Sequence, residues 1–222
     1  MSDITKRPAA GLPTWQKKLE QASGGKPLSQ RTRPTATQSP IVVLAIDCST
    51  SMKGDKLRQA RRGAMEFGED AIRRGYMVGI VAFASTNSTI VLLSPTTALT
   101  PFRAALEKLA LAGSTDMATG IGLATTQIDR RPGSVICIVT DGEPDSQKET
   151  IASASHARTL GIEIMAVGTD DADWEFLSQI VTRTELAAKV ERAQFSTQIA
   201  SMAKNLPQLP SPARTRTLPP GK

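Results

Sequence analysis

The chain has 222 residues and a formal net charge of +6, from 27 lysines and arginines against 21 aspartates and glutamates. A single histidine and two cysteines exclude a multi-histidine zinc site, a four-cysteine metal site and a disulfide-based scaffold. Hydrophobic residues make up 40% of the chain, which is too many for a wholly disordered protein and enough for one buried core.

In chain order, the apolar patterns predict alternating strands and helices between residues 41 and 204. Continuous runs of apolar residues predict buried strands, and apolar residues at helical spacing predict helices. The expected elements are a strand at 41–46, a helix at 55–74, strands at 77–84 and 89–93, helices at 101–111 and 117–128, a strand at 134–140, a helix at 146–160, a strand at 162–167, a helix at 173–180, an edge strand at 185–190 and a helix at 193–204. This alternation is typical of βαβ crossovers, so we predict an α/β fold with a mostly parallel central sheet and helices on both faces.

Charge and proline divide the chain into three parts. Residues 1–40 hold five of the 14 prolines and seven basic against two acidic residues, a balance of +5. Residues 205–222 hold five further prolines, three basic residues and no acidic one, and residues 41–204 have 17 basic against 19 acidic residues, a balance of −2. We therefore predict one domain at 41–204 between a basic, proline-rich, largely disordered N-terminal extension and a basic, proline-rich C-terminal tail.

Three polar loops are expected at one edge of the sheet, because the carboxyl ends of parallel strands lie together. Asp47, Ser49 and Ser51 follow the first strand, Asp141 follows the strand at 134–140, and Thr115 lies in a loop that leads into a helix. Two carboxylates and several hydroxyls form an all-oxygen set, which suits a hard divalent cation such as Mg²⁺ or Mn²⁺. A position left open on such an ion could accept a carboxylate from another molecule.

The spacing Asp47-x-Ser49-x-Ser51, followed by Thr115 and by Thr140-Asp141-Gly142, resembles the metal-ion-dependent adhesion site of von Willebrand factor A domains. The resemblance covers about residues 41–204 and implies a Rossmann-like three-layer fold. It also implies a Mg²⁺ or Mn²⁺ ion and a role in protein binding without catalysis. The metal residues that it implies are Asp47, Ser49, Ser51, Thr115 and Asp141.

Four polar residues beside these positions are candidates for contacting a partner protein: Ser114, Asp116, Glu143 and Asp145. The partner is expected to present an Asp or Glu side chain to the metal. The first ten residues lack a signal-peptide core, and no apolar window is long enough to span a membrane, so we expect a cytoplasmic protein. The resemblance to intracellular bacterial members of the family implies a multiprotein system built around an AAA+ ATPase or around kinases and phosphatases.

Two other functions fit parts of the sequence. An Asp after the first strand of a parallel sheet resembles Mg²⁺-dependent phosphatases of the haloacid dehalogenase type, but their second Asp, two residues later, is Ser49 here. His156, the one histidine, is predicted to pack on a helix rather than to act as a base. The basic extensions could bind nucleic acid or an anionic surface, but they lack interleaved aromatic residues, so nucleic acid is not the partner that we expect.

Two smaller features are predicted to be structural. The run Gly120-Ile121-Gly122 follows no strand and has no third glycine at the spacing of a dinucleotide-binding loop, so helix–sheet packing explains it better. Cys48 and Cys137 are expected to be reduced, with Cys137 in the core, because about 13 Å of strand separates Cys137 from the sheet edge near Cys48.

Overall fold

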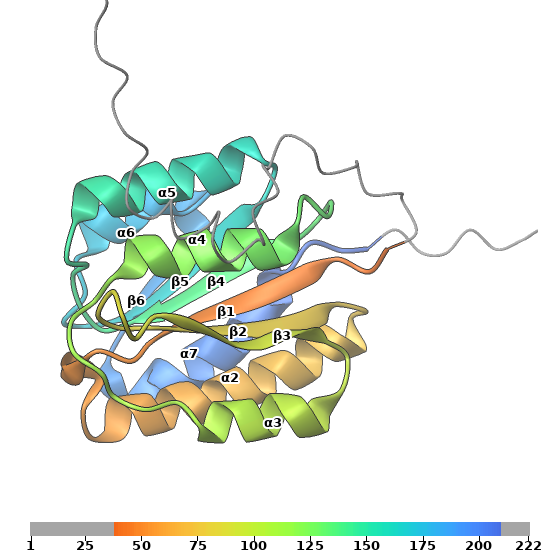
Figure 1. The fold of residues 1–222 in the computed structure, drawn as a ribbon. Coiled ribbons are helices and arrows are strands. Elements are labelled where there is room, and N and C mark those ends of the chain that lie inside the picture. The colour runs from red at the N-terminus through yellow and green to blue at the C-terminus, as the bar shows by residue number, and fades with distance from the viewer. Residues whose placement is uncertain (1–37, 210–222) are drawn as a thin grey trace, which may run out of the picture.

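The computed structural model describes residues 38–209, and Figure 1 shows their arrangement as helices on both sides of a central sheet. The N-terminal extension predicted at 1–40 therefore lies almost entirely outside the described residues, as does the C-terminal tail after residue 209. Among the residues that the structure describes, no helix is both long and apolar enough to cross a bilayer.

The central sheet has six strands in the order β3-β2-β1-β4-β5-β6. Neighbouring strands are parallel throughout, except that β3 runs antiparallel to β2. The prediction of a mostly parallel sheet is confirmed. The strands are β1 (Ile41–Asp47), β2 (Met77–Phe83), β3 (Ile90–Thr96), β4 (Val135–Thr140), β5 (Glu163–Thr169) and β6 (Ala187–Val190).

Helices cover both faces of this sheet, as Figure 1 shows. One face is covered by α2 (Asp55–Arg73), α3 (Leu99–Glu107) and α7 (Phe195–Ser201), and the other by α4 (Met117–Ile128), α5 (Gln147–Thr159) and α6 (Trp174–Ile180). Short 3-10 segments complete the chain at Thr50–Met52, Thr184–Leu186, Arg192–Gln194 and Met202–Asn205. The three-layer, Rossmann-like α/β fold is confirmed.

Alternation along β1 explains why the core lies on both sides of the sheet. Successive side chains of a strand point to opposite faces, and every residue of β1 is buried. Val42, Leu44 and Ile46 belong to the apolar cluster under α2, α3 and α7. Ile41, Val43 and Ala45 belong to the cluster under α4, α5 and α6. A continuous apolar strand is therefore the expected sequence for this position.

Several elements, β3 and α3 among them, differ from the sequence prediction by one or more residues at their ends. β3 runs through Pro95 to Thr96 instead of ending at residue 93, which is possible because β3 is an edge strand and does not need every backbone donor. α3 ends at Glu107 rather than at residue 111. The chain after α3 turns so that Leu109 is buried and the Ala112 amide donates to the Cys48 carbonyl at 2.8 Å.

Packing continues past Lys204, into residues that the charge and proline pattern assigns to the C-terminal tail. Leu206 is buried against the core. The Tyr76 hydroxyl donates to the Pro207 carbonyl at 2.8 Å, which ties this segment to the turn between α2 and β2. The two cysteines are free and buried, as predicted.

A close approach of α4 to β2 depends on Gly120. A Cβ atom at this position would lie 2.8 Å from Phe83 Cβ and 3.0 Å from Phe83 Cγ, closer than carbon atoms normally pack. The structure thus agrees with helix–sheet packing as the reason for this glycine. The contact also fixes the start of α4, which follows the loop that carries Thr115.

We expect Gly120→Ala to lower the free energy of unfolding by about 1 to 3 kcal/mol, because the added methyl group overpacks the contact with Phe83. The higher helix propensity of alanine, worth about 1 kcal/mol, offsets part of this loss. Urea unfolding would measure the difference, with Gln127→Ala at a partly exposed position of α4 as the control. A Gly120→Ala variant at least as stable as the control would contradict the close packing.

Candidate metal centre

The strand order places two aspartates at neighbouring strand ends. β1 continues to β2 on one side and has β4 on the other, so the order switches between β1 and β4. Ligands of open α/β sheets bind in the crevice at such a switch. Asp47 is the last residue of β1, and Asp141 directly follows β4. Because Ile46 pairs with Val139, the two carboxylates emerge at the same edge of the sheet.

A chain of hydrogen bonds connects these two carboxylates through two serines. Asp47 Oδ1 accepts from the Ser49 amide at 2.8 Å. The Ser49 and Ser51 hydroxyl oxygens are 2.8 Å apart, and Ser51 Oγ donates to Asp141 Oδ1 at 2.7 Å. The structure therefore brings together four of the five predicted metal residues. Thr140 is part of the Thr140-Asp141-Gly142 run, but the sequence assigns it no role. Its hydroxyl donates to Asp47 Oδ2 at 2.7 Å.

A second group of hydrogen bonds surrounds Thr115, the fifth predicted metal residue. The Thr115 amide donates to Asp145 Oδ1 at 2.9 Å, and its carbonyl accepts from the Asp145 amide at 3.0 Å. Ser114 Oγ donates to Asp145 Oδ2 at 2.7 Å. The Thr50 amide donates to the Gly113 carbonyl at 3.0 Å, so this loop is fastened to the loop after β1.

The remaining partner-binding candidates differ in exposure. Glu143 and Asp145 are exposed, as is Ser114, and they lie on loops at the edge of the sheet. Asp116 is partly buried, and its carboxylate caps α4 by accepting from the Thr119 amide at 3.1 Å. Asp116 thus has a structural role that leaves it less available to a partner than the three exposed residues.

Both carboxylates of the centre are removed from water. Asp47 is 0% exposed and Asp141 is 1% exposed. Burial raises the pKa of Asp47 to about 6, although hydrogen bonds from Thr140 and Ser49 oppose the rise, and the charge of Asp141 adds to it. The ionised form of Asp47 is therefore costly in the protein alone, and a bound cation would stabilise it.

Sequence reasoning missed a lysine at this centre. Lys56, in the first turn of α2, is 7% exposed, and its Nζ lies 2.5 Å from Asp141 Oδ2 and 2.7 Å from Asp171 Oδ2. Burial lowers the pKa of Lys56, but the hydrogen bonds to the two carboxylates outweigh this and raise it above its ordinary value. One signal was available, because Lys56 precedes the buried Ala60 by four residues and so extends the inward stripe of α2.

The donor set fits a hard divalent cation. It holds two carboxylates and the hydroxyls of Ser49 and Ser51, all of them oxygen donors. Within residues 38–209, no group of three or more His, Cys, Asp or Glu side chains is arranged to hold a metal, so the candidate centre depends on serine hydroxyls as well as on its two carboxylates. Asp47, Ser49, Ser51 and Asp141 are the residues that would hold the ion.

Relatives in bacteria resemble part of this chain. A UPF0353 protein of Mycolicibacterium vanbaalenii is 31% identical over 148 residues, which cover 57% of this chain and 43% of the relative. A UPF0353 protein of Mycolicibacterium gilvum is 30% identical over the same length, with the same coverage. The match thus spans less than half the length of these relatives.

Solved structures share the fold at low sequence identity. The von Willebrand factor domain of the pilus tip protein Mfa5 from Porphyromonas gingivalis superposes with a TM-score of 0.65 at 12% identity, covering 76% of this chain and 95% of that one. Proximal thread matrix protein 1 from the mussel byssus, solved with a zinc-occupied MIDAS motif, has a TM-score of 0.64 at 18% identity, covering 77% and 46%. A von Willebrand factor type A protein from Catenulispora acidiphila has a TM-score of 0.63 at 19% identity, covering 75% and 42%.

A family model gives the assignment directly. The model of the von Willebrand factor type A domain matches residues 42–209, about three quarters of the chain. The match begins one residue into β1 and ends with the last residue that the structure describes. This chain belongs to the von Willebrand factor type A domain family.

Proposed function

We propose that the domain binds Mg²⁺ or Mn²⁺ at Asp47, Ser49, Ser51, Thr115 and Asp141, and that the ion holds an Asp or Glu side chain of a partner protein. The observation that carries this proposal is a hydrogen-bonded connection between the two buried carboxylates: the Ser49 amide donates to Asp47, and the Ser49 hydroxyl is bonded to the Ser51 hydroxyl, which donates to Asp141. When bound, the ion would supply positive charge at the edge of the sheet, and a partner carboxylate could coordinate to it.

The residues of this chain have separate roles in the proposal. Asp47 and Asp141 supply the negative charge, and Ser49 and Ser51 supply neutral oxygens that exchange their mutual hydrogen bond for the ion. Thr115 completes the set from a loop that backbone bonds already fasten beside the centre.

The exposed residues beside the centre indicate a second property of the partner, and we call these residues the rim. Glu143 and Asp145 carry negative charge at the same edge of the sheet. Like charges repel across an interface, so a partner with basic residues beside its metal-binding Asp or Glu would be preferred. We include Ser114 in this rim because its hydroxyl is exposed and bonded to Asp145.

Binding without turnover is part of the same proposal. A phosphatase that used Asp47 as its nucleophile would need an acid two residues later, and Ser49 occupies that position. The bacterial relatives support a bacterial setting. The proposal also includes a cytoplasmic location. There the protein would be part of a multiprotein system that contains an AAA+ ATPase or kinases and phosphatases.

Partner capture tests the proposal with the full chain as bait in a lysate of its source organism. Wild type in Mg²⁺ should retain a protein that is lost in EDTA, and Asp141→Asn should lose it in both conditions, because one charged metal ligand is gone. Glu66→Gln removes the same charge from an exposed position of α2 and should behave as wild type. Equal recovery of every protein in EDTA and in Mg²⁺ would refute the proposal.

The phosphatase alternative has its own readout. The full chain with Mg²⁺ should not hydrolyse p-nitrophenyl phosphate faster than buffer does. Hydrolysis that disappears in Asp47→Asn would favour the enzyme and count against a binding module.

The raised pKa of Asp47 also predicts how the stability of the metal-free protein depends on pH. Its pKa is about 6 in the folded protein against 3.8 for an ordinary Asp, so the folded state resists ionisation. The contribution of Asp47 to stability is therefore largest below about pH 4 and is lost as the pH rises through 6. A shift of this size corresponds to about 3 kcal/mol.

We therefore expect Asp47→Asn to raise the free energy of unfolding at pH 8 in EDTA, by up to about 3 kcal/mol, and to change it little at pH 4. The Thr140 hydroxyl can accept from the new amide while it donates to the Gly142 carbonyl, from which it lies 3.3 Å. Urea unfolding at both pH values measures the effect, and Mg²⁺ should stabilise only the wild type. A variant no more stable than wild type at pH 8 would contradict the raised pKa.

A further inference from the structure

Lys56 gives the two oxygens of Asp141 different surroundings. Oδ1 accepts from the Ser51 hydroxyl at 2.7 Å, on the side of the proposed metal residues. Oδ2 lies 2.5 Å from Lys56 Nζ. The ammonium group therefore occupies one oxygen of this carboxylate and leaves the other for the hydroxyl chain.

The buried position of Lys56 has an energetic cost. Its side chain is 9% exposed, so the ammonium has lost most of its hydration. A cation in the first turn of a helix also opposes the helix dipole, which favours negative charge at that end. Asp171 offsets these costs from the other side, because its Oδ2 lies 2.7 Å from Lys56 Nζ.

Asp171 lies on the loop after β5, outside the proposed set of metal residues. Its side chain is 51% exposed and is also paired with Arg192 at 3.3 Å. Arg192 balances the charge of Asp171 near the surface, where water screens both groups. The buried charges that remain at the centre are those of Asp47, Asp141 and Lys56.

The sum of these charges sets what the loaded centre attracts. Two carboxylates would neutralise a divalent ion, whereas two carboxylates with one ammonium leave the loaded centre at +1. A centre with a charge of +1 attracts an external carboxylate more strongly than a neutral one does. The same ammonium repels the metal, so it weakens metal binding.

We propose that Lys56 acts as a built-in counter-ion of Asp141, which weakens metal binding and strengthens capture of the partner's acidic side chain. This inference rests on the proposed function, since it assigns the charge of the loaded centre. Lys56 then positions Asp141 and alters the affinity of the centre for the ion, and it does so without contacting the partner.

Two titrations test this inference on the full chain. Calorimetry with Mn²⁺ gives the metal Kd, and acetate added to the Mn²⁺-loaded protein is followed by the loss of water-proton relaxation as it displaces metal-bound water. Lys56→Met should tighten the Mn²⁺ Kd by about threefold to tenfold and weaken the acetate Kd by at least threefold, because the charge of +1 is gone. Lys56→Arg keeps the charge and should restore both constants toward wild type.

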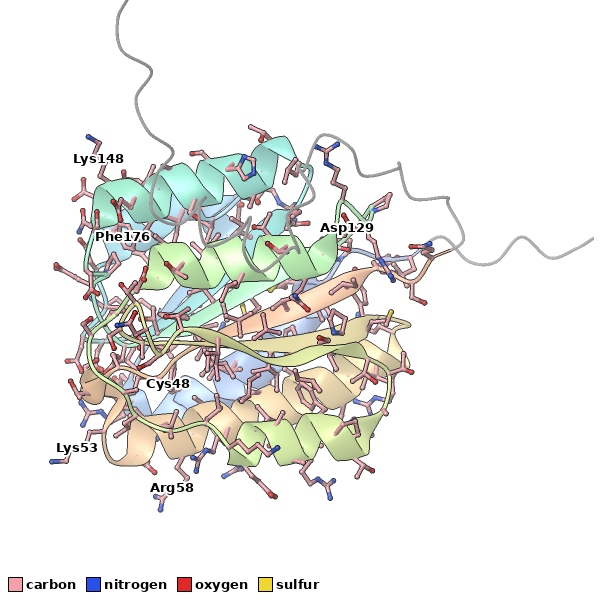
Figure 2. The ribbon with its side chains drawn as sticks, in the orientation of Figure 1. Cys48, Lys53, Arg58, Asp129, Lys148 and Phe176 are labelled. Atoms are coloured by element: carbon pink, nitrogen blue, oxygen red, sulfur yellow. The ribbon has the colours of Figure 1, made fainter. Side chains whose placement is uncertain are left out.

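Arg58 provides a matched control on the same turn of α2. Its side chain is 81% exposed, and Figure 2 shows it pointing into solvent at the outer side of α2. Arg58→Met removes the same charge and should change both constants by less than twofold, because exposed charges are screened. If Lys56→Met unfolds, Lys56→Gln serves in its place, because it removes the same charge but keeps a polar side chain that can donate to Asp141, and both constants should shift as in Lys56→Met.

The outcomes separate this inference from the proposed function. Opposite shifts of the two constants in Lys56→Met support the counter-ion. Constants that weaken together, or that stay at wild-type values, overturn it and leave the metal-binding proposal standing. A wild type that binds no Mn²⁺ overturns both.

Discussion

The burial of two carboxylates at neighbouring strand ends is the constraint on which the rest of the centre depends. An ionised carboxylate loses several kcal/mol of hydration when it leaves water, so it must be paired, hydrogen-bonded or bound to a cation. Thr140 and the Ser49 amide satisfy Asp47, and Ser51 and Lys56 satisfy Asp141. Even so, burial holds the pKa of Asp47 at about 6, so these bonds do not fully replace water. A divalent ion would supply the missing charge.

The loops around these carboxylates are held together before any ligand arrives. Backbone bonds join Thr50 to Gly113, Cys48 to Ala112, and Thr115 to Asp145. The first two bonds link the loop after β1 to the loop before α4, and the third links that second loop to the segment after β4, so segments distant in the sequence meet at the carboxyl edge of the sheet. A centre fixed in this way loses little conformational entropy on binding, which favours affinity. Gly120 contributes from a distance, because it lets α4 approach β2 and so places the loop that carries Thr115.

The fold could be predicted from sequence because its strands are buried on both faces. Such strands read as continuous apolar runs, of which β1 and β4 are examples. The order of the strands could not be predicted in this way, since an apolar pattern does not say which strand pairs with which. The extension of β3 through Pro95 was missed for the same reason, because proline is tolerated only where the strand forms an edge.

The centre was predictable to the extent that its residues follow strand ends at short spacing. Asp47, Ser49 and Ser51 are local in sequence, and Asp141 follows a recognisable strand. Lys56 and Asp171 were missed because their contacts are made only in the folded chain. Lys56 is 85 residues from Asp141 and 115 from Asp171. Its place on the inward stripe of α2 was visible, but its partners were not.

A crystal structure grown with Mn²⁺ tests the central claim most directly, because anomalous scattering locates the ion without assumptions about its ligands. We predict one strong peak at the carboxyl edge of the sheet, bonded to the Ser49 and Ser51 hydroxyl oxygens and close to Asp47 and Asp141. The Lys56 ammonium should still contact Asp141 on the side away from the ion. A peak elsewhere, or no peak at saturating Mn²⁺, would contradict a metal centre built from these residues.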